Sequence, residues 1–126
     1  MNEPILIVDD HPQNLKLARI VLEGDGYDIR TAADAEQALA ILETFAPRLI
    51  LMDLQLPGMD GLELTRRLKA DPHRSHILVV ALTAYAMKGD EERALAAGCD
   101  AYITKPIDTD ELPRVVAALL ARQGGS

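Results

Sequence analysis

The sequence predicts an α/β fold in which helices cover both faces of a doubly wound parallel sheet. Three continuous apolar runs, at residues 5–8, 49–52 and 77–82, have the length and composition of strands buried on both sides. Two further runs, at 27–32 and 101–104, alternate more between apolar and polar residues and predict less central strands. Helical patterns separate these runs, so the chain contains five strand–helix units, which favours parallel strands joined by right-handed crossovers.

The helical segments have apolar residues three and four positions apart. The first pattern covers residues 13–23, and a Gly-Asp-Gly sequence follows it as a stop signal. Asp34 and Asp60 each precede a helical pattern and are followed three residues later by Gln37 and Glu63, as in a capping box. We therefore expect helices to begin directly after these two aspartates.

The last two predicted helices differ in how firmly they should pack. Residues 87–97 have an apolar face made mostly of alanine, so we expect this helix to pack loosely. The final helix has apolar residues at every position that an amphipathic helix requires, but it also contains Pro113. Because proline lacks an N–H and is tolerated only in the first turn, the cap should be Thr109 or Asp110.

Length and composition indicate one domain over residues 1–126, with a short flexible tail at 123–126. There are 20 acidic and 13 basic residues, a net charge of −7, and only 3% aromatic residues, which disfavours direct binding of nucleic acid. No basic leader precedes the first apolar run, and no run reaches the roughly 18 residues of a membrane span. With Cys99 as the single cysteine, we expect a soluble cytoplasmic protein without membrane insertion.

Charged and hydroxyl-bearing residues follow four of the predicted strands. Asp9 and Asp10 follow the first strand, Asp53 the third, Thr83 the fourth and Lys105 the fifth. In a parallel sheet these ends lie at one edge, which is where such folds bind ligands. Each residue alone has an ordinary structural explanation, such as a helix cap or a turn. Those separate explanations do not account for their occurrence together at one edge.

The three aspartates predict a site for a divalent cation. Neighbouring carboxylates raise one another's pKa, so they do not all remain ionised without compensating charge. An all-oxygen ligand set selects Mg²⁺ or a similar hard ion, and that ion together with Lys105 would balance the three negative charges. Such a site can accept a phosphoryl group held by metal, ammonium and hydroxyl, and a carboxylate can be its nucleophile. The pattern therefore predicts phosphoryl capture on an aspartate beside Mg²⁺.

Four motifs at these strand ends resemble those of the receiver domains of bacterial two-component response regulators. They are LIVDD at 6–10, LMDLQLPGMDG at 51–61, ALTA at 81–84 and YITKP at 102–106. The likeness extends over about residues 4–122, and it implies the flavodoxin-like (βα)5 fold with strand order 2-1-3-4-5. The stretch at 83–92 further resembles single-domain regulators of alphaproteobacterial cell division, and also receivers fused to hybrid sensor kinases.

The resemblance implies roles for the acidic residues. Asp53 would be the phosphoacceptor. Asp10, Asp53 and the backbone carbonyl of Gln55 would bind Mg²⁺, and Asp9 would act through a metal-bound water. The peptide bond before Pro106 is expected to be cis, as in the family.

The resemblance also implies how the site would signal. Lys105 would pair with the phosphoryl oxygens, and Thr83 would hydrogen-bond the phosphoryl group and, in moving, let Tyr102 turn inward. The fourth helix, fifth strand and fifth helix would form the output face. Ala84 is small enough to leave the site open to a phosphodonor, and Tyr85 would border the pocket and influence loss of the phosphoryl group.

The expected partners follow from the same family. They are a sensor histidine kinase or histidine phosphotransfer protein as donor and a downstream protein as target, with the chain a monomer or a phosphorylation-dependent dimer. It would be no enzyme beyond catalysing its own phosphorylation and dephosphorylation. Because 20 residues follow Pro106, we expect action by docking, either as a free regulator or as a phosphate shuttle. A receiver fragment of a hybrid sensor kinase is the alternative.

Two other classes with a similar sheet fit less well. An aspartate-nucleophile phosphatase would require a second aspartate two residues after Asp53, and Gln55 stands there. A flavodoxin-like cofactor carrier would have a Ser/Thr/Gly-rich first loop, which here is Asp-Asp-His-Pro-Gln. His11 in that loop could line the site, although the following Pro12 favours a role at the start of the first helix.

Overall fold

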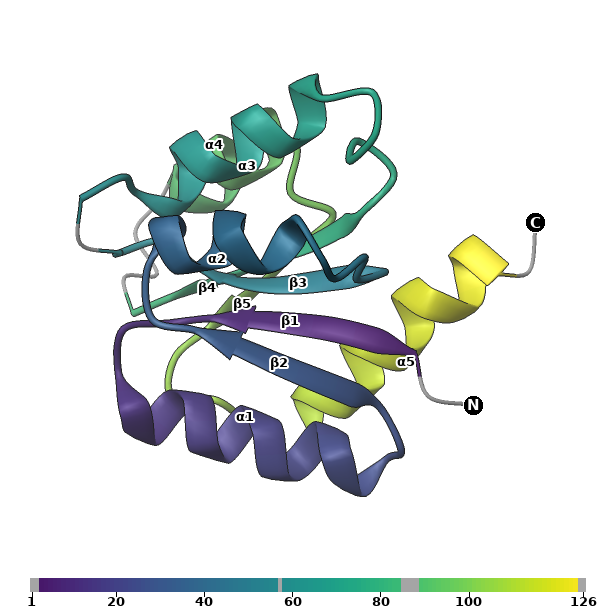
Figure 1. Ribbon diagram of the computed structural model, residues 1–126. Helices are drawn as coiled ribbons and strands as arrows, with labels where there is room; N and C mark the ends of the chain where they lie inside the picture. Colours follow the sequence, from purple (N-terminus) through teal and green to yellow (C-terminus); the bar gives the residue numbers. More distant parts are fainter. Residues whose placement is uncertain (1–2, 57, 85–88, 125–126) are drawn as a thin grey trace.

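Five parallel strands form a sheet in the order β2-β1-β3-β4-β5, which confirms the expected topology (Figure 1). The computed structural model describes residues 3–56, 58–84 and 89–124. The strands are β1 (Pro4–Val8), β2 (Asp28–Ala32), β3 (Leu49–Asp53), β4 (Leu78–Thr83) and β5 (Ala101–Thr104). Since all neighbouring strands pair in parallel, their carboxyl ends lie at one edge of the sheet.

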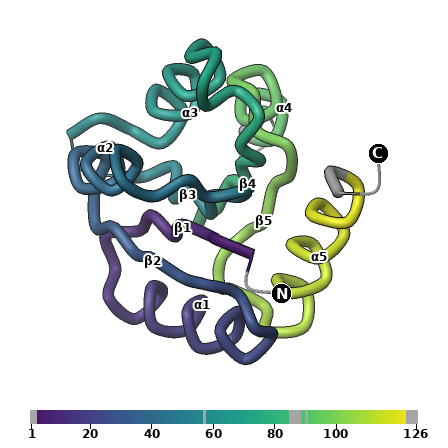
Figure 2. Tube along the Cα trace, turned by 45° about the vertical axis from the view of Figure 1, so that its right-hand side comes forward, coloured from purple at the N-terminus to yellow at the C-terminus, as the bar shows by residue number. Residues whose placement is uncertain are grey.

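Helices cover both faces of the sheet, as predicted (Figure 1 and Figure 2). They are α1 (Pro12–Gly24), α2 (Ala35–Leu42), α3 (Gly61–Ala70), α4 (Asp90–Ala96) and α5 (Glu111–Gly124). One buried cluster joins α1 and α5 to the sheet, and a second joins α2, α3 and α4 to the opposite face. The protein therefore has three layers with the sheet in the middle.

Strand β1 shows why the apolar runs are continuous. Its residues Ile5, Leu6, Ile7 and Val8 are all fully buried. Successive side chains of a strand point to opposite faces, so Leu6 and Val8 pack with α2, α3 and α4, whereas Ile5 and Ile7 pack with α1 and α5. A strand covered on both faces excludes polar side chains until it ends, and the first one after β1 is Asp9.

The caps of α2 and α3 confirm the prediction. Oδ1 of Asp34 accepts the N–H of Gln37 at 2.8 Å, and Oδ1 of Asp60 accepts the N–H of Glu63 at 2.8 Å. Each helix therefore begins directly after an aspartate that satisfies one of its free N–H groups.

The cap of α5 differs from the prediction. The helix begins at Glu111, and Pro113 lies in its first turn as expected. The capping side chain, however, is Asp108 instead of Thr109 or Asp110. Its Oδ1 accepts the N–H of Asp110 at 2.8 Å and that of Glu111 at 3.1 Å. Residues 109–110 form a turn, which brings a carboxylate from further upstream within reach of both groups.

Helix α4 is shorter than the predicted segment at 87–97. It begins at Asp90 after Gly89, which has a φ of 101°, and residues 87–88 lie outside the described residues. Ala94 is fully buried in the cluster under α2, α3 and α4, whereas Leu95 is 49% exposed. The contact of this helix with the core is therefore made by alanine, as its sequence indicated.

Helix α5 continues to Gly124, so residues 123–124 of the expected tail are helical, and residues 125–126 lie outside the described part of the chain. Among the described helices, none combines the length and apolar character needed to cross a membrane.

Candidate functional site

The predicted site residues meet at the carboxyl edge of the sheet. In the β1–β3 register, Asp9 comes level with Asp53, which is the last residue of β3. Thr83 is the last residue of β4, and Lys105 directly follows β5. The strand register thus brings together residues that are far apart in the sequence.

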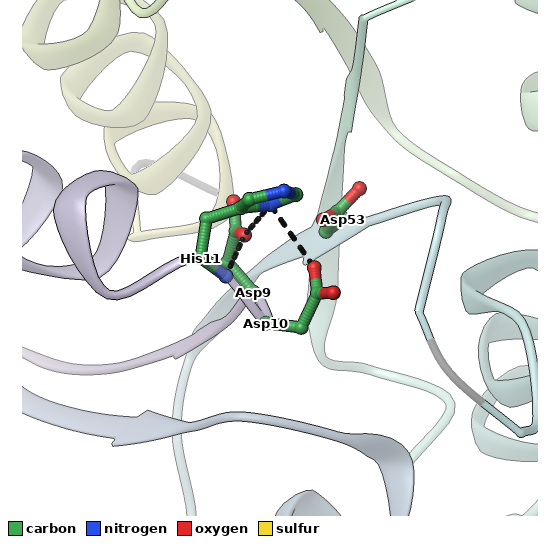
Figure 3. A group of neighbouring side chains, drawn as sticks. All are labelled: Asp9, Asp10, His11 and Asp53. Atoms are coloured by element: carbon green, nitrogen blue, oxygen red, sulfur yellow. Dashed lines mark hydrogen bonds and ion pairs between the residues drawn. The ribbon is translucent and has the colours of Figure 1, made fainter.

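Asp9, Asp10, His11 and Asp53 form a group that could hold a metal ion (Figure 3). One ligand atom from each residue lies within 4.8 Å of the others. Asp9 and Asp53 are fully buried, whereas the side chains of Asp10 and His11 are 33% and 62% exposed. The group therefore has an inner part made of buried carboxylates and an outer part that solvent reaches.

Lys105 provides positive charge next to the two buried carboxylates. Its Nζ lies 3.1 Å from Oδ2 of Asp9 and 3.1 Å from Oδ2 of Asp53, and its side chain is only 10% exposed. The Lys105–Pro106 peptide bond is cis, which confirms that expectation. One ammonium does not balance the charge of three carboxylates, so this edge keeps an excess of negative charge.

Three carboxylate oxygens of the group are buried and accept no hydrogen bond of good geometry from a described residue. They are Oδ2 of Asp9, Oδ1 of Asp10 and Oδ2 of Asp53. Lys105 pairs with the first and the last of them, and Nδ1 of His11 lies 3.1 Å from the second, so one ammonium faces three carboxylates. Burying charge that is not fully paired is costly. Mg²⁺ takes carboxylate oxygens as ligands and supplies the missing charge. The donor set present at this edge therefore fits a magnesium ion.

Asp53 and Lys105 respond differently to their surroundings. Burial raises the pKa of Asp53, and the charge of Asp9 raises it further. The N–H of Gln55 and the ammonium of Lys105 lower this pKa, but they do not outweigh the rise. Burial acts to lower the pKa of Lys105, but its contacts with the two carboxylates outweigh burial and raise it. Lys105 is therefore a firmly held ammonium, whereas further positive charge would favour the ionised form of Asp53.

Gln55 connects Asp53 to Thr83. Its backbone N–H donates to Oδ1 of Asp53 at 2.9 Å, and its Nε2 donates to Oγ1 of Thr83 at 3.1 Å. Thr83 is 1% exposed, whereas the adjacent Ala84 is exposed. The sequence placed Gln55 beside the site, but the contact of its side chain with Thr83 was not predicted.

Gly61 allows α3 to begin directly against the end of β3. A Cβ at this position would lie 2.3 Å from the backbone oxygen of Asp53 and 2.9 Å from Cα of Leu54. No other residue fits such a close approach without a backbone shift. The glycine that closes the LMDLQLPGMDG motif thus has a steric reason.

The sequence leaves two roles open for His11, one lining the site and one at the start of the first helix. In the structure it does both. It directly precedes α1, and its backbone N–H donates to Oδ1 of Asp9 at 2.8 Å. Its Nδ1 lies 3.2 Å from that oxygen and 3.1 Å from Oδ1 of Asp10. Roles at the site were also predicted for two tyrosines. Tyr102 is partly buried and packs against the cluster under α2, α3 and α4, and Tyr85 lies outside the described residues.

A parallel sheet with this strand order and an acidic group at its carboxyl edge defines the class of protein. The model of the response regulator receiver domain matches residues 5–117, and the chain belongs to this family. The family consists of signalling domains that interact with histidine kinases or phosphotransfer proteins, and not of classical enzymes. Its members generally bind Mg²⁺ at an acidic pocket, and the aspartate group described above is of that kind.

Particular relatives resemble the chain over nearly its whole length. The polar-differentiation response regulator DivK of Brucella ovis is 46% identical over 125 residues, which cover 98% of either chain. The structure of a CheY-like receiver domain protein from Methanospirillum hungatei is 34% identical, with a TM-score of 0.91 and coverage of 99% of this chain and 98% of that one. The signal receiver domain of a histidine kinase from Syntrophus aciditrophicus is 35% identical, with a TM-score of 0.87 and coverage of 94% and 90%.

Proposed function

We propose that this receiver domain is a phosphorylation-dependent signalling switch of a two-component phosphorelay, with Asp53 as the phosphoacceptor. The observation that carries this proposal is the environment of Asp53. Its carboxylate is fully buried, and its Oδ2 lies 3.1 Å from Nζ of Lys105. A carboxylate is a competent nucleophile, and a fixed ammonium beside it stabilises the negative charge of an incoming phosphoryl group.

The transfer would exchange one bond to phosphorus for another. An oxygen of Asp53 forms a bond to the phosphorus of a phosphohistidine while the P–N bond breaks and the imidazole leaves. Lys105 pairs with the phosphoryl oxygens, and Thr83 donates its hydroxyl to one of them. Water later hydrolyses the acyl phosphate to carboxylate and inorganic phosphate, so the chain catalyses only its own phosphorylation and dephosphorylation.

Mg²⁺ would be held by Asp10, Asp53 and the backbone carbonyl of Gln55, with Asp9 acting through a water. When bound, the ion supplies the positive charge that favours ionised Asp53 and attracts the phosphoryl oxygens. The grouping of the three carboxylates within 4.8 Å, with one ammonium against their three charges, supports this ligand set.

The output would pass through α4, β5 and α5. Movement of Thr83 toward the phosphoryl group would let Tyr102 turn inward and change this face, on which Leu95 is 49% exposed.

We propose a sensor histidine kinase or a histidine phosphotransfer protein as the donor and a protein as the target. We also propose a cytoplasmic location and a monomer or a phosphorylation-dependent dimer. Ala84 and Tyr85 would border the phosphoryl group.

A receiver fragment of a hybrid sensor kinase, or a phosphate shuttle, is the second candidate. The likeness to the receiver domain of the Syntrophus histidine kinase supports it. An aspartate-nucleophile phosphatase has less support, because the amide of Gln55 has no acid–base capacity at the position where that class needs a carboxylic acid.

The proposal is tested by incubating the protein with Mg²⁺ and acetyl phosphate and measuring its intact mass. We expect the gain of one phosphoryl group, and its loss in Asp53→Asn and after chelation of the metal. Asp28→Asn, which changes an exposed aspartate of β2, is the matched control and should be modified like the wild type. An unmodified wild type that still binds Mg²⁺ would reject the switch and indicate a receiver that is not phosphorylated.

A further inference from the structure

Gln55 contacts both residues whose coupling would operate the switch, one through its backbone and the other through its side chain. Its backbone N–H is bound to Oδ1 of Asp53 at 2.9 Å, and its Nε2 is bound to Oγ1 of Thr83 at 3.1 Å. Its Oε1 also faces the backbone N–H of Ala84 at 3.5 Å, a distance at the outer limit of a hydrogen bond. One amide thus tethers the end of β4 to the loop that follows β3.

We propose that Gln55 is a positioning residue that holds Thr83 in its unphosphorylated arrangement, an inference that rests on the proposed function. The switch requires the hydroxyl of Thr83 to move toward a phosphoryl group on Asp53. In the structure that hydroxyl is anchored by the amide of Gln55. The hydrogen bond therefore stabilises the resting arrangement and has to break or rearrange when Thr83 moves.

A phosphoryl group on Asp53 would also compete with Oε1 of Gln55 for the backbone N–H of Ala84. Its oxygens are charged acceptors, and charged acceptors bind N–H groups more strongly than a neutral amide oxygen does. The N–H of Ala84 therefore gains by exchanging Oε1 of Gln55 for a phosphoryl oxygen. Because Gln55 is exposed at the surface, solvent can replace the lost contacts and the tether is weak enough to be released.

The test uses the binding of beryllofluoride, a non-covalent phosphoryl mimic, at saturating Mg²⁺. The readout is the ¹⁹F resonance of bound beryllofluoride, which reports binding in every variant, including those that lack Thr83. We expect Gln55→Met, which keeps the length of the side chain, to bind beryllofluoride about 2- to 10-fold more tightly than the wild type, the effect of one hydrogen bond. Gln55→Ala should change in the same direction, and Gln13→Met, at an exposed position of α1, should not change.

A double-mutant cycle separates a tether on Thr83 from a general structural role. In the Thr83→Val background, the effect of Gln55→Met should fall below about twofold, because the partner hydroxyl is absent. Equal or weaker binding by Gln55→Met, or a gain that persists in the valine background, overturns the tether while leaving the proposed function intact. If the wild type shows no binding of beryllofluoride with Mg²⁺, the proposed function fails and the tether fails with it.

Discussion

At the scale of single residues, the site depends on which atoms are allowed to face Asp53. Its backbone oxygen fills the space where a Cβ of residue 61 would lie, so that position is glycine. Its side-chain oxygens face Lys105 and the N–H of Gln55. Space on one side and charge on the other therefore constrain the residues around Asp53.

We expect Gly61→Ala to lower the free energy of unfolding by about 1–3 kcal/mol, the usual cost of forcing an extra methyl group into a packed region. The new Cβ would lie 2.3 Å from a backbone oxygen, so the start of α3 or the end of β3 must shift. Urea unfolding measures the difference. In the control Gly24→Ala, the Cβ meets nothing within 4 Å, and no loss of stability is expected. Equal stability of the two variants would contradict the close approach.

At the scale of elements, the start of each helix depends on the side chain that reaches its free N–H groups. Asp34 and Asp60 stand directly before their helices, whereas α5 uses Asp108 from further upstream. The N–H groups of Asp110 and Glu111 lower the pKa of Asp108, because they bind its ionised form. The cap of α5 is therefore sensitive to acid.

The lowered pKa fixes the sign of a pH dependence. The contribution of Asp108 to stability is present above its unfolded pKa, ordinarily 3.8, and is lost as the pH falls through the lower folded value. Asp108→Ala should therefore unfold at lower urea than the wild type at pH 7, and the difference should shrink as the pH falls below 3.8. Thr109→Ala is the control and should change little at either pH. A difference that is the same at all pH values would contradict the cap.

At the scale of the whole molecule, the fold concentrates charge that the composition alone does not reveal. The chain has a net charge of −7, and three strands bring Asp9, Asp10 and Asp53 to the same edge as Lys105. Without a metal ion, the negative charge at this edge lies partly on Asp9 and Asp53, which are fully buried. The free energy of unfolding of the whole domain should therefore respond to the charge of Asp53.

We expect Asp53→Asn to raise the free energy of unfolding in a chelator at pH 7. The raised pKa of Asp53 means that folding favours its protonated form. Its contribution to stability is thus lost as the pH rises from 3.8 through the folded pKa, and the amide avoids this loss. Urea unfolding with EDTA measures the change, and Asp28→Asn should show none.

Adding Mg²⁺ should change the difference in the free energy of unfolding between the wild type and Asp53→Asn. A ligand at ten times its Kd stabilises the folded state by about 1.4 kcal/mol, and the wild type should gain this amount. Asp53→Asn, which lacks one proposed ligand, should gain little. A wild type whose unfolding is unaffected by Mg²⁺ would contradict the metal site.

The sequence by itself determined the fold class and which polar residues meet at the carboxyl edge of the sheet. Buried parallel strands require continuous apolar runs, so the ends of those runs mark Asp9, Asp53, Thr83 and Lys105. Local signals sufficed in the same way for the caps at Asp34 and Asp60, because a cap and its partner are three residues apart.

Only the tertiary structure decided how the side chains at the site contact one another. The tether from Gln55 to Thr83 joins residues 28 positions apart, and the contacts of Lys105 with the aspartates join different strands. Such contacts depend on strand register and on side-chain direction, which local sequence patterns do not encode. The cap at Asp108 was missed for a related reason, since the conformation of the turn at 109–110 decides which carboxylate reaches the helix.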